Sequence, residues 1–164
     1  MFGRFSPIRR NERKLMKQKR IRMTLVVLEV FVALGAVAGG ISLLTGAIPA
    51  SLDGLQGSPF VDYTVPAWSL MVMVGGSMLF AASTILTRRE IGVLASVFAG
   101  LAMMIFEIVE VAVIDRTGGS ELLFAVVLQI FYFALGLAIF VLSSRLWLTE
   151  YRNHHFPTRP ISHV

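Results

Sequence analysis

The sequence predicts an all-α, polytopic membrane protein, built as a four-transmembrane-helix bundle with both termini in the cytoplasm (N-in/C-in). Hydrophobic residues occupy 55 % of the 164 positions and charged residues only 15 %, whereas a typical soluble domain has about 25 % charged residues. Four apolar stretches are each long enough to cross a hydrocarbon core of about 30 Å, which takes about 20 helical residues. When these stretches are threaded back and forth across a membrane, every Lys and Arg except Arg116 falls on the same side of it.

The chain begins with a basic segment, residues 1–22, which we interpret as a cytoplasmic tail, partly helical, that lies on anionic lipid headgroups. The apolar stretch after it is too long for a secretory signal and lacks a small-residue cleavage site. The residues expected to contact headgroups are Arg9, Arg10, Arg13, Lys14, Lys17, Lys19, Arg20 and Arg22.

The predicted bundle occupies residues 23–148, and its spans cover about residues 23–47, 65–86, 91–114 and 122–146. The first connection contains two Asp residues and no Lys or Arg, the next turn carries Arg88 and Arg89, and a C-terminal tail (149–164) is again basic. Because Lys and Arg are retained on the cytoplasmic side, we expect a multi-pass protein of the bacterial inner membrane with both tails cytoplasmic.

Small residues recur at helical spacing in the spans, as close helix packing in lipid requires. The residues expected at helix–helix contacts are Gly35, Gly39, Gly75, Gly76, Gly92, Ser96 and Gly100. If the third span packs through its small residues, Val93 should face lipid. Two interpretations stay open: packing within one chain, or contact of one small-residue stripe with a second copy.

Polar residues inside the third and fourth spans are candidates for a site. An ionised carboxylate in hydrocarbon costs about 2.5–3.5 kcal/mol on insertion scales, so intramembrane acids indicate function or a specific partner. Glu107 and Glu110 are three residues apart and share a helix face. Gln129 is expected at the depth of Glu107, where its amide could donate a hydrogen bond to the carboxyl. The structural alternative is a hydrogen bond that holds these two helices together.

Glu29 is a separate candidate, roughly 9 Å in from the cytoplasmic end of the first span. It differs in height from Glu107 by about 15 Å, so the two do not form a carboxylate pair. Ser83 and Thr84 are expected at the depth of Glu29 and could hydrogen-bond it.

Several kinds of chemistry are excluded by residue type. The chain has no cysteine, which excludes disulfides, thiolate metal sites and Fe–S clusters. The histidines, His154, His155 and His163, all lie in the C-terminal tail, so a bis-histidine haem site in the membrane is excluded. Since no nucleophile–base set and no phosphate-binding loop is found, we expect no enzymatic activity, no metal and no cofactor.

The chain resembles a group of small, uncharacterised bacterial four-helix membrane proteins. The similarity begins in LEVFVALGAVAGGISLLTG (residues 28–46) and continues in GSPFVDYTVPAWSLMVMVGGS (57–77), FEIVEVAVI (106–114) and LQIFYFALG (128–136). It covers about residues 25–143 and implies a four-helix bundle without an assigned activity. The basic N-terminal tail is a departure from that group.

We therefore expect a non-enzymatic integral membrane protein that is an accessory or scaffold subunit of a membrane complex. Its partners would be the bilayer with its anionic headgroups and a membrane protein or a second copy, with no nucleic acid. The alternative is a small proton- or cation-coupled transporter or channel that works as a homodimer through Glu107, Glu110 and Gln129. A transporter would need the second copy, because four helices enclose little space.

Overall fold

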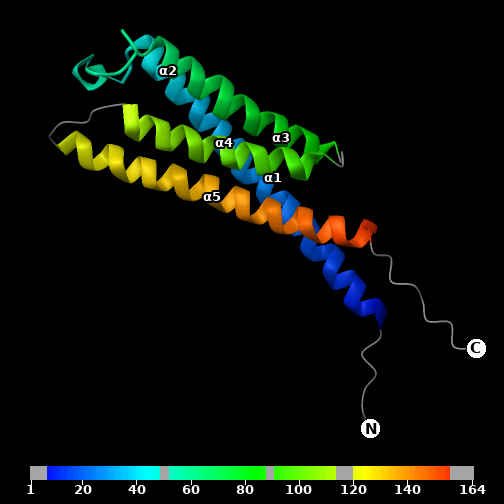
Figure 1. Cartoon of the computed structure of the whole chain (residues 1–164). Helices are drawn as coiled ribbons and strands as arrows, with labels where there is room; N and C mark the ends of the chain where they lie inside the picture. The colour runs from blue at the N-terminus through cyan, green and yellow to red at the C-terminus, as the bar shows by residue number, and fades with distance from the viewer. Residues whose placement is uncertain (1–6, 49–51, 88–90, 114–119, 156–164) are drawn as a thin grey trace, which may run out of the picture.

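The computed structural model describes residues 7–48, 52–87, 91–113 and 120–155, and the regular structure within these ranges is entirely helical (Figure 1). The helices long and apolar enough to cross a membrane are Leu15–Thr45, Thr64–Leu86, Gly92–Val113 and Ala125–Thr149. The predicted all-α fold with four transmembrane helices is confirmed, and the protein is a multi-pass membrane protein with four spans. The turn with Arg88 and Arg89 lies outside the described residues.

The first helix, α1, runs without a break from Pro7 to Thr45. Proline suits the first position of a helix, where a missing N–H is not needed, and no Gly or Pro follows until Gly35. The residue after the helix, Gly46, has a φ of 70°, the left-handed conformation common after a helix C-terminus. The basic N-terminal segment from Pro7 onward is therefore a direct continuation of the first span.

The second span contains a change of helix type. It consists of α2 (Thr64–Ser69), the π-helix η2 (Leu70–Gly76) and α3 (Ser77–Leu86). Its start is fixed by Asp62, whose Oδ1 accepts the Thr64 N–H at 2.8 Å, and Pro66 lies in the first turn. The 3-10 helix η1 (Leu52–Leu55) precedes it and buries Leu55.

The remaining helices, α4 (Gly92–Val113) and α5 (Ser120–His155), complete an arrangement of one row and one crossing helix. Helices α3, α4 and α5 lie side by side with α4 in the middle, and α1 crosses this row diagonally (Figure 1). Helix α1 packs on α3, η2 and α5. The start of α1 and the end of α5 lie at the same end of the molecule (Figure 1).

The hydrophobic core lies between α1 and the row. The largest fully buried apolar side chains come from all four spans and are Leu25, Val32, Val74, Met78, Val93, Met103 and Ile139. The expectation that Val93 faces lipid is wrong. Because α4 has a neighbour on each side and α1 near one face, it turns Val93 inward together with Gly92 and Ser96.

Candidate functional site

Glu29 lies on α1 at the centre of the packed region, and its side chain is 0 % exposed. Neither Oε1 nor Oε2 has a hydrogen-bond partner in the described part of the chain. Ser96 of α4 is the polar side chain that approaches this carboxyl. Its hydroxyl, however, donates to the Gly92 carbonyl at 3.1 Å. The carboxyl is thus fully buried beside a hydroxyl oxygen and receives no hydrogen bond.

The contacts between helices give the level of this carboxyl in the bundle. Gly75 lies opposite Ala33 and Ala36 of α1, since a Cβ added to it would be 3.6 Å from Ala33 O and 3.5 Å from Ala36 Cβ. The two helices are antiparallel, so residues that precede Ala33 on α1 lie opposite residues that follow Gly75. This places Glu29 opposite about residues 79–82 of α3. A Cβ on Gly92 would lie 2.8 Å from Ile85 N, which places Ser96 opposite about residue 81. Glu29 and Ser96 therefore lie at one level, about 6 Å inward from the start of α4.

The expected partners of Glu29 on the second span do not bond to it. The buried Thr84 hydroxyl is 2.8 Å from Ala81 O and 3.0 Å from Phe80 O. Ser83 is exposed, and its hydroxyl donates to Phe80 O at 2.8 Å. The prediction that Ser83 or Thr84 hydrogen-bonds Glu29 is therefore wrong. Depth follows from counting residues, but successive residues of a helix point about 100° apart, and this rotation turns Ser83 away from the core.

At the other end of the bundle, Glu107 is 7 % exposed and Glu110 is partly buried. A Cβ on Gly100 would lie 2.9 Å from Gly136 O. Glu107 lies two helical turns after Gly100 on α4, and Gln129 lies two helical turns before Gly136 on the antiparallel α5. These two residues therefore lie at about the same level of the α4–α5 interface.

The predicted hydrogen bond from Gln129 to Glu107 is not formed. The Gln129 Nε2 atom is buried and has no hydrogen-bond acceptor within the described residues. The α4–α5 interface thus contains a buried amide donor and a buried carboxyl at one level without the bond that sequence reasoning expects between them.

Two glycines of α4 allow backbones to touch. A Cβ on Gly92 would meet Thr84 C at 2.9 Å, and one on Gly100 would meet Phe140 N at 2.8 Å. Real Cβ atoms do not approach other backbones so closely, so these positions fix the spacing of α4 from α3 and α5. On α1, a Cβ on Gly35 would meet the hydroxyl oxygen of a tyrosine side chain, Tyr132, at 2.8 Å.

The glycines at the α1–second span contact differ in role. A Cβ on Gly39 would be 3.4 Å from Leu70 Cδ2, and one on Gly75 would be 3.4 Å from Val37 Cγ2, both ordinary contacts. Gly76 is exposed, so it packs on no other helix of the described chain. Gly40, which was not among the expected packing residues, comes closer: its Cβ would lie 2.9 Å from Ala67 O.

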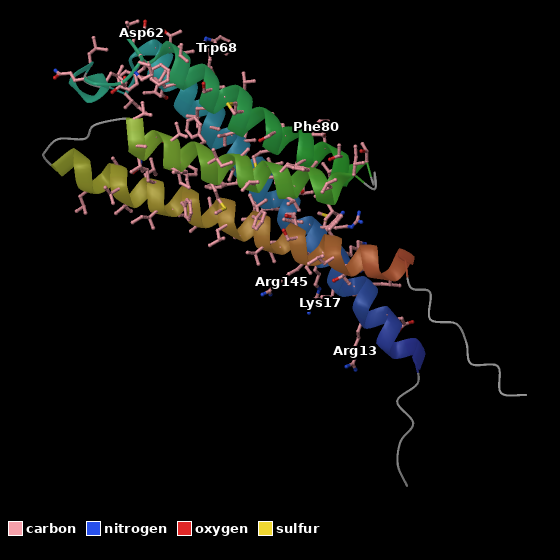
Figure 2. The ribbon with its side chains drawn as sticks, viewed as in Figure 1. Arg13, Lys17, Asp62, Trp68, Phe80 and Arg145 are labelled. Carbon is pink, nitrogen blue, oxygen red and sulfur yellow. The ribbon has the colours of Figure 1, made fainter. Side chains whose placement is uncertain are left out.

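The basic part of α1 extends beyond the bundle (Figure 2). Ile21 is the first residue of the helix that packs against the core. Before it, Arg13, Lys17, Lys19 and Arg20 are exposed, and Arg22 is partly buried. The side chains of the remaining expected headgroup residues, Arg9, Arg10 and Lys14, lie outside the described part of the structure.

No metal centre is found in the residues that the structure describes, because no three His, Asp or Glu side chains come together. Comparison of the chain with protein-family models, with curated proteins and with solved structures gave no match in any of the three. The four long apolar helices are those of a four-helix membrane protein, and any more specific function has to be inferred from the geometry.

Proposed function

We propose that the protein is a non-enzymatic accessory or scaffold subunit of a membrane complex. The observation that supports this proposal is the uneven burial of the four spans. In the most apolar part of α5 only 11 % of the residues are buried, against 39 % in each of the other three spans. Helix α5 lies at the edge of the row and meets α1 only where the two cross (Figure 1). Most of its circumference is therefore open to a partner.

The open side of α5 has a pattern suited to another helix. The exposed residues Leu123, Val127, Ile130, Ala134 and Leu137, which we name the α5 stripe, follow one another at alternating spacings of four and three. This is the spacing of a helix–helix seam. Ala134, the small residue of this stripe, would allow the backbone of a second helix to come close, as small residues do at membrane interfaces. We therefore assign the α5 stripe to a helix of another membrane protein.

The experiment places a photo-crosslinking amino acid at Ile130 of the α5 stripe and, as the control, at Ile105, an exposed isoleucine of α4. We expect a discrete adduct with a different membrane protein from position 130 only. Ala134→Phe should abolish that adduct, because a phenyl ring holds the helices apart. The control, Ala112→Phe at an exposed alanine of α4, should leave the yield of the adduct unchanged. An adduct of two copies, or equal adducts from both positions, would contradict the proposal.

The proposed orientation has both termini in the cytoplasm of a bacterium. It is supported by the common end at which α1 begins and α5 ends (Figure 1), together with the basic residues of α1 and Arg145, which is exposed on α5. On this side, basic side chains would meet the anionic headgroups of the inner membrane.

A second candidate function, proton or cation transport by a homodimer, is favoured by one observation. Glu107, Glu110 and Gln129 lie on facing helices, and the Gln129 amide is buried without an acceptor. A polar ligand or a proton between α4 and α5 would interact with these groups. Substitution of Glu107 distinguishes this function from the scaffold.

A further inference from the structure

The Glu29 carboxyl is a fully buried polar group without a hydrogen-bond donor. Both of its oxygens lack a partner within the described residues, although polar groups in a protein interior are almost always satisfied. Glu29 differs in this respect from an acid that faces lipid headgroups or a water-filled cavity, because none of its surface is exposed. None of the residues that the structure describes completes the site.

The hydroxyl groups near this level bond within their own helices instead. A hydroxyl has one hydrogen to donate, and Ser96 directs that hydrogen to Gly92 O at 3.1 Å. Thr84 directs its hydrogen to the carbonyls of its own helix, at 2.8 Å from Ala81 O. While its hydrogen is directed to Gly92 O, Ser96 presents oxygen lone pairs to the Glu29 carboxyl, and lone pairs repel an ionised carboxylate.

Among the described side chains, no positive charge bonds to the Glu29 carboxyl either. The span Thr64–Leu86 contains no ionisable residue, and the acids of α4, Glu107 and Glu110, lie roughly 16 Å or more along the helix from Ser96. On α5, Arg145 is exposed. On α1, Arg22 lies two turns before Glu29 and is partly buried, about 10 Å away along the axis. A carboxylate at this position would be a buried charge without a counter-ion, which is strongly unfavourable.

We infer that Glu29 is a proton-binding site. A proton taken up from water converts the carboxylate to a carboxyl group, with no other bond made or broken. The proton removes the negative charge and turns one carboxyl oxygen into a donor, whose O–H points to Ser96 Oγ; Ser96 in turn donates to Gly92 O. Because this level is about 6 Å inward from the start of α4, the proton exchanges with water at the end of the bundle where α1 begins and α5 ends. This inference does not depend on the proposed scaffold role.

The test uses the full-length protein in liposomes and the infrared carbonyl-stretch band that a protonated carboxyl gives and a carboxylate does not. We expect such a band at acidic pH, its disappearance when the pH is raised, and its complete loss in Glu29→Gln at every pH. Glu107→Gln is the matched control, since it removes the other buried acid and should leave this band in place. Glutamine preserves the volume of glutamate, so the fold should be retained in both variants.

A second pair of variants tests the geometry. Ser96→Ala removes the acceptor of the carboxyl O–H and should shift the band to the frequency of a carboxyl without a hydrogen bond. Ser143→Ala is the control: Ser143 is also fully buried and donates to its own helix, at 2.6 Å from Ile139 O, and it should leave the frequency unchanged. Equal shifts in the two variants would overturn the assignment of Ser96 as the acceptor.

Three results would overturn the proton site. The first is the absence of any band that depends on Glu29 at acidic pH. The second is a band that persists unchanged at alkaline pH, which would make the carboxyl a permanent structural donor. The third is loss of the band on adding sodium at constant pH, which would assign the site to a metal cation.

Discussion

Glu29 and Glu107 are both buried glutamates, but the helices around them offer different polar groups. Glu29 faces Ser96, whose hydrogen is directed elsewhere. Glu107 lies at the level of Gln129, whose Nε2 is an available donor. A small rotation of the Gln129 side chain could bond to Glu107, whereas no rotation that keeps the Ser96–Gly92 bond could satisfy an ionised Glu29. The two acids are therefore expected to respond differently to substitution.

Substitutions of Glu107 distinguish a structural role from transport. If the residue only holds α4 to α5, Glu107→Gln should leave stability almost unchanged, and Glu107→Leu should lower it by about 1 kcal/mol, the usual size of a polar contact between membrane helices. The measurements are thermal unfolding in detergent and proton or cation flux in liposomes. Flux in the wild type that is lost in Glu107→Gln would contradict the scaffold and support the transporter.

Gly100→Leu should destabilise the protein, because a side chain at this position collides with the backbone of Phe140. Overpacking of this kind typically costs about 1–3 kcal/mol. The matched control is Gly76→Leu, at an exposed glycine of the second span, where the same substitution meets no neighbouring helix. Thermal unfolding in detergent would measure both, and a control variant as unstable as Gly100→Leu would show that Gly76 packs on an undescribed partner.

Sequence reasoning reached the depth of each polar residue but not the direction in which it points. Depth follows from helix rise and span boundaries, so the sequence predicts a common level for Glu107 and Gln129, as the Gly100–Gly136 contact supports. Direction depends on how each helix is rotated about its axis, which neighbouring helices decide. For this reason Ser96, predicted only to pack, approaches Glu29, while Ser83 faces outward.

Among the elements, α1 differs most from what its sequence alone suggests. A helix of 39 residues is about 58 Å long, roughly twice the thickness of the hydrocarbon core. If the core begins near Met23, then Lys17, Lys19 and Arg20 lie about 5–9 Å from it, within the headgroup layer, and Arg13 lies about 15 Å away, beyond that layer. The basic segment thus combines a lipid-contacting part with an outer part that reaches the aqueous phase.

Replacement of Lys17, Lys19 and Arg20 by Gln should weaken binding of anionic lipid. Each basic residue near a membrane surface contributes about 1 kcal/mol, so the triple variant should lose about 3 kcal/mol, or roughly 100-fold in affinity. The control removes the same charge farther out, by replacing Arg9, Arg10 and Arg13 with Gln. Binding of a fluorescent anionic lipid to the protein in detergent measures the difference, and equal losses in both variants would contradict this division of the helix.

The length of α1 and the π-helix η2 illustrate what hydropathy can and cannot predict. A hydropathy pattern detects which stretches are apolar enough to cross hydrocarbon, and the described residues form four such helices. It does not detect whether a helix continues into water, which for α1 follows from the absence of a breaker between Ile8 and Leu34. Nor does it detect η2, where the backbone widens locally and the hydrophobicity does not change.

At the scale of the whole molecule, three helices in a row and one across them leave the bundle asymmetric. Helix α4 lies between α3 and α5, and α5 forms an edge (Figure 1). A compact square bundle would expose its four helices about equally, so the row provides an edge on which another helix can dock. The sequence indicates the number of helices, but the order in which they lie side by side depends on contacts between residues far apart in the chain.

The proposed orientation predicts which introduced cysteines react with an impermeant thiol reagent. The chain has no cysteine of its own, so each label reports one position. In intact spheroplasts, Leu52→Cys in η1 should be labelled and Arg13→Cys in α1 should be labelled only after permeabilisation. Labelling of position 13 in intact spheroplasts would reverse the topology while leaving the fold unchanged.

The π-helix makes one region of the second span tolerant of a shorter chain. A π-turn holds about one residue more than an α-turn, so deleting the exposed Met73 should let η2 become α-helical and keep Met78 and Ala82 facing the core. Deleting the exposed Leu101 of α4 should instead rotate Met103 and Glu107 by about 100°. Thermal unfolding should show a cooperative transition for the first deletion and none for the second.

This tolerance has a consequence for how the protein can diverge. A gap inside a membrane span is normally eliminated by selection, because it turns every later residue of the helix away from its contacts. Within residues 70–76, a lineage could lose a codon and retain the same interior. Proteins that share an ancestor with this chain should therefore differ in length by a single residue within this π-helix. The parts of the second span before and after it should align without gaps.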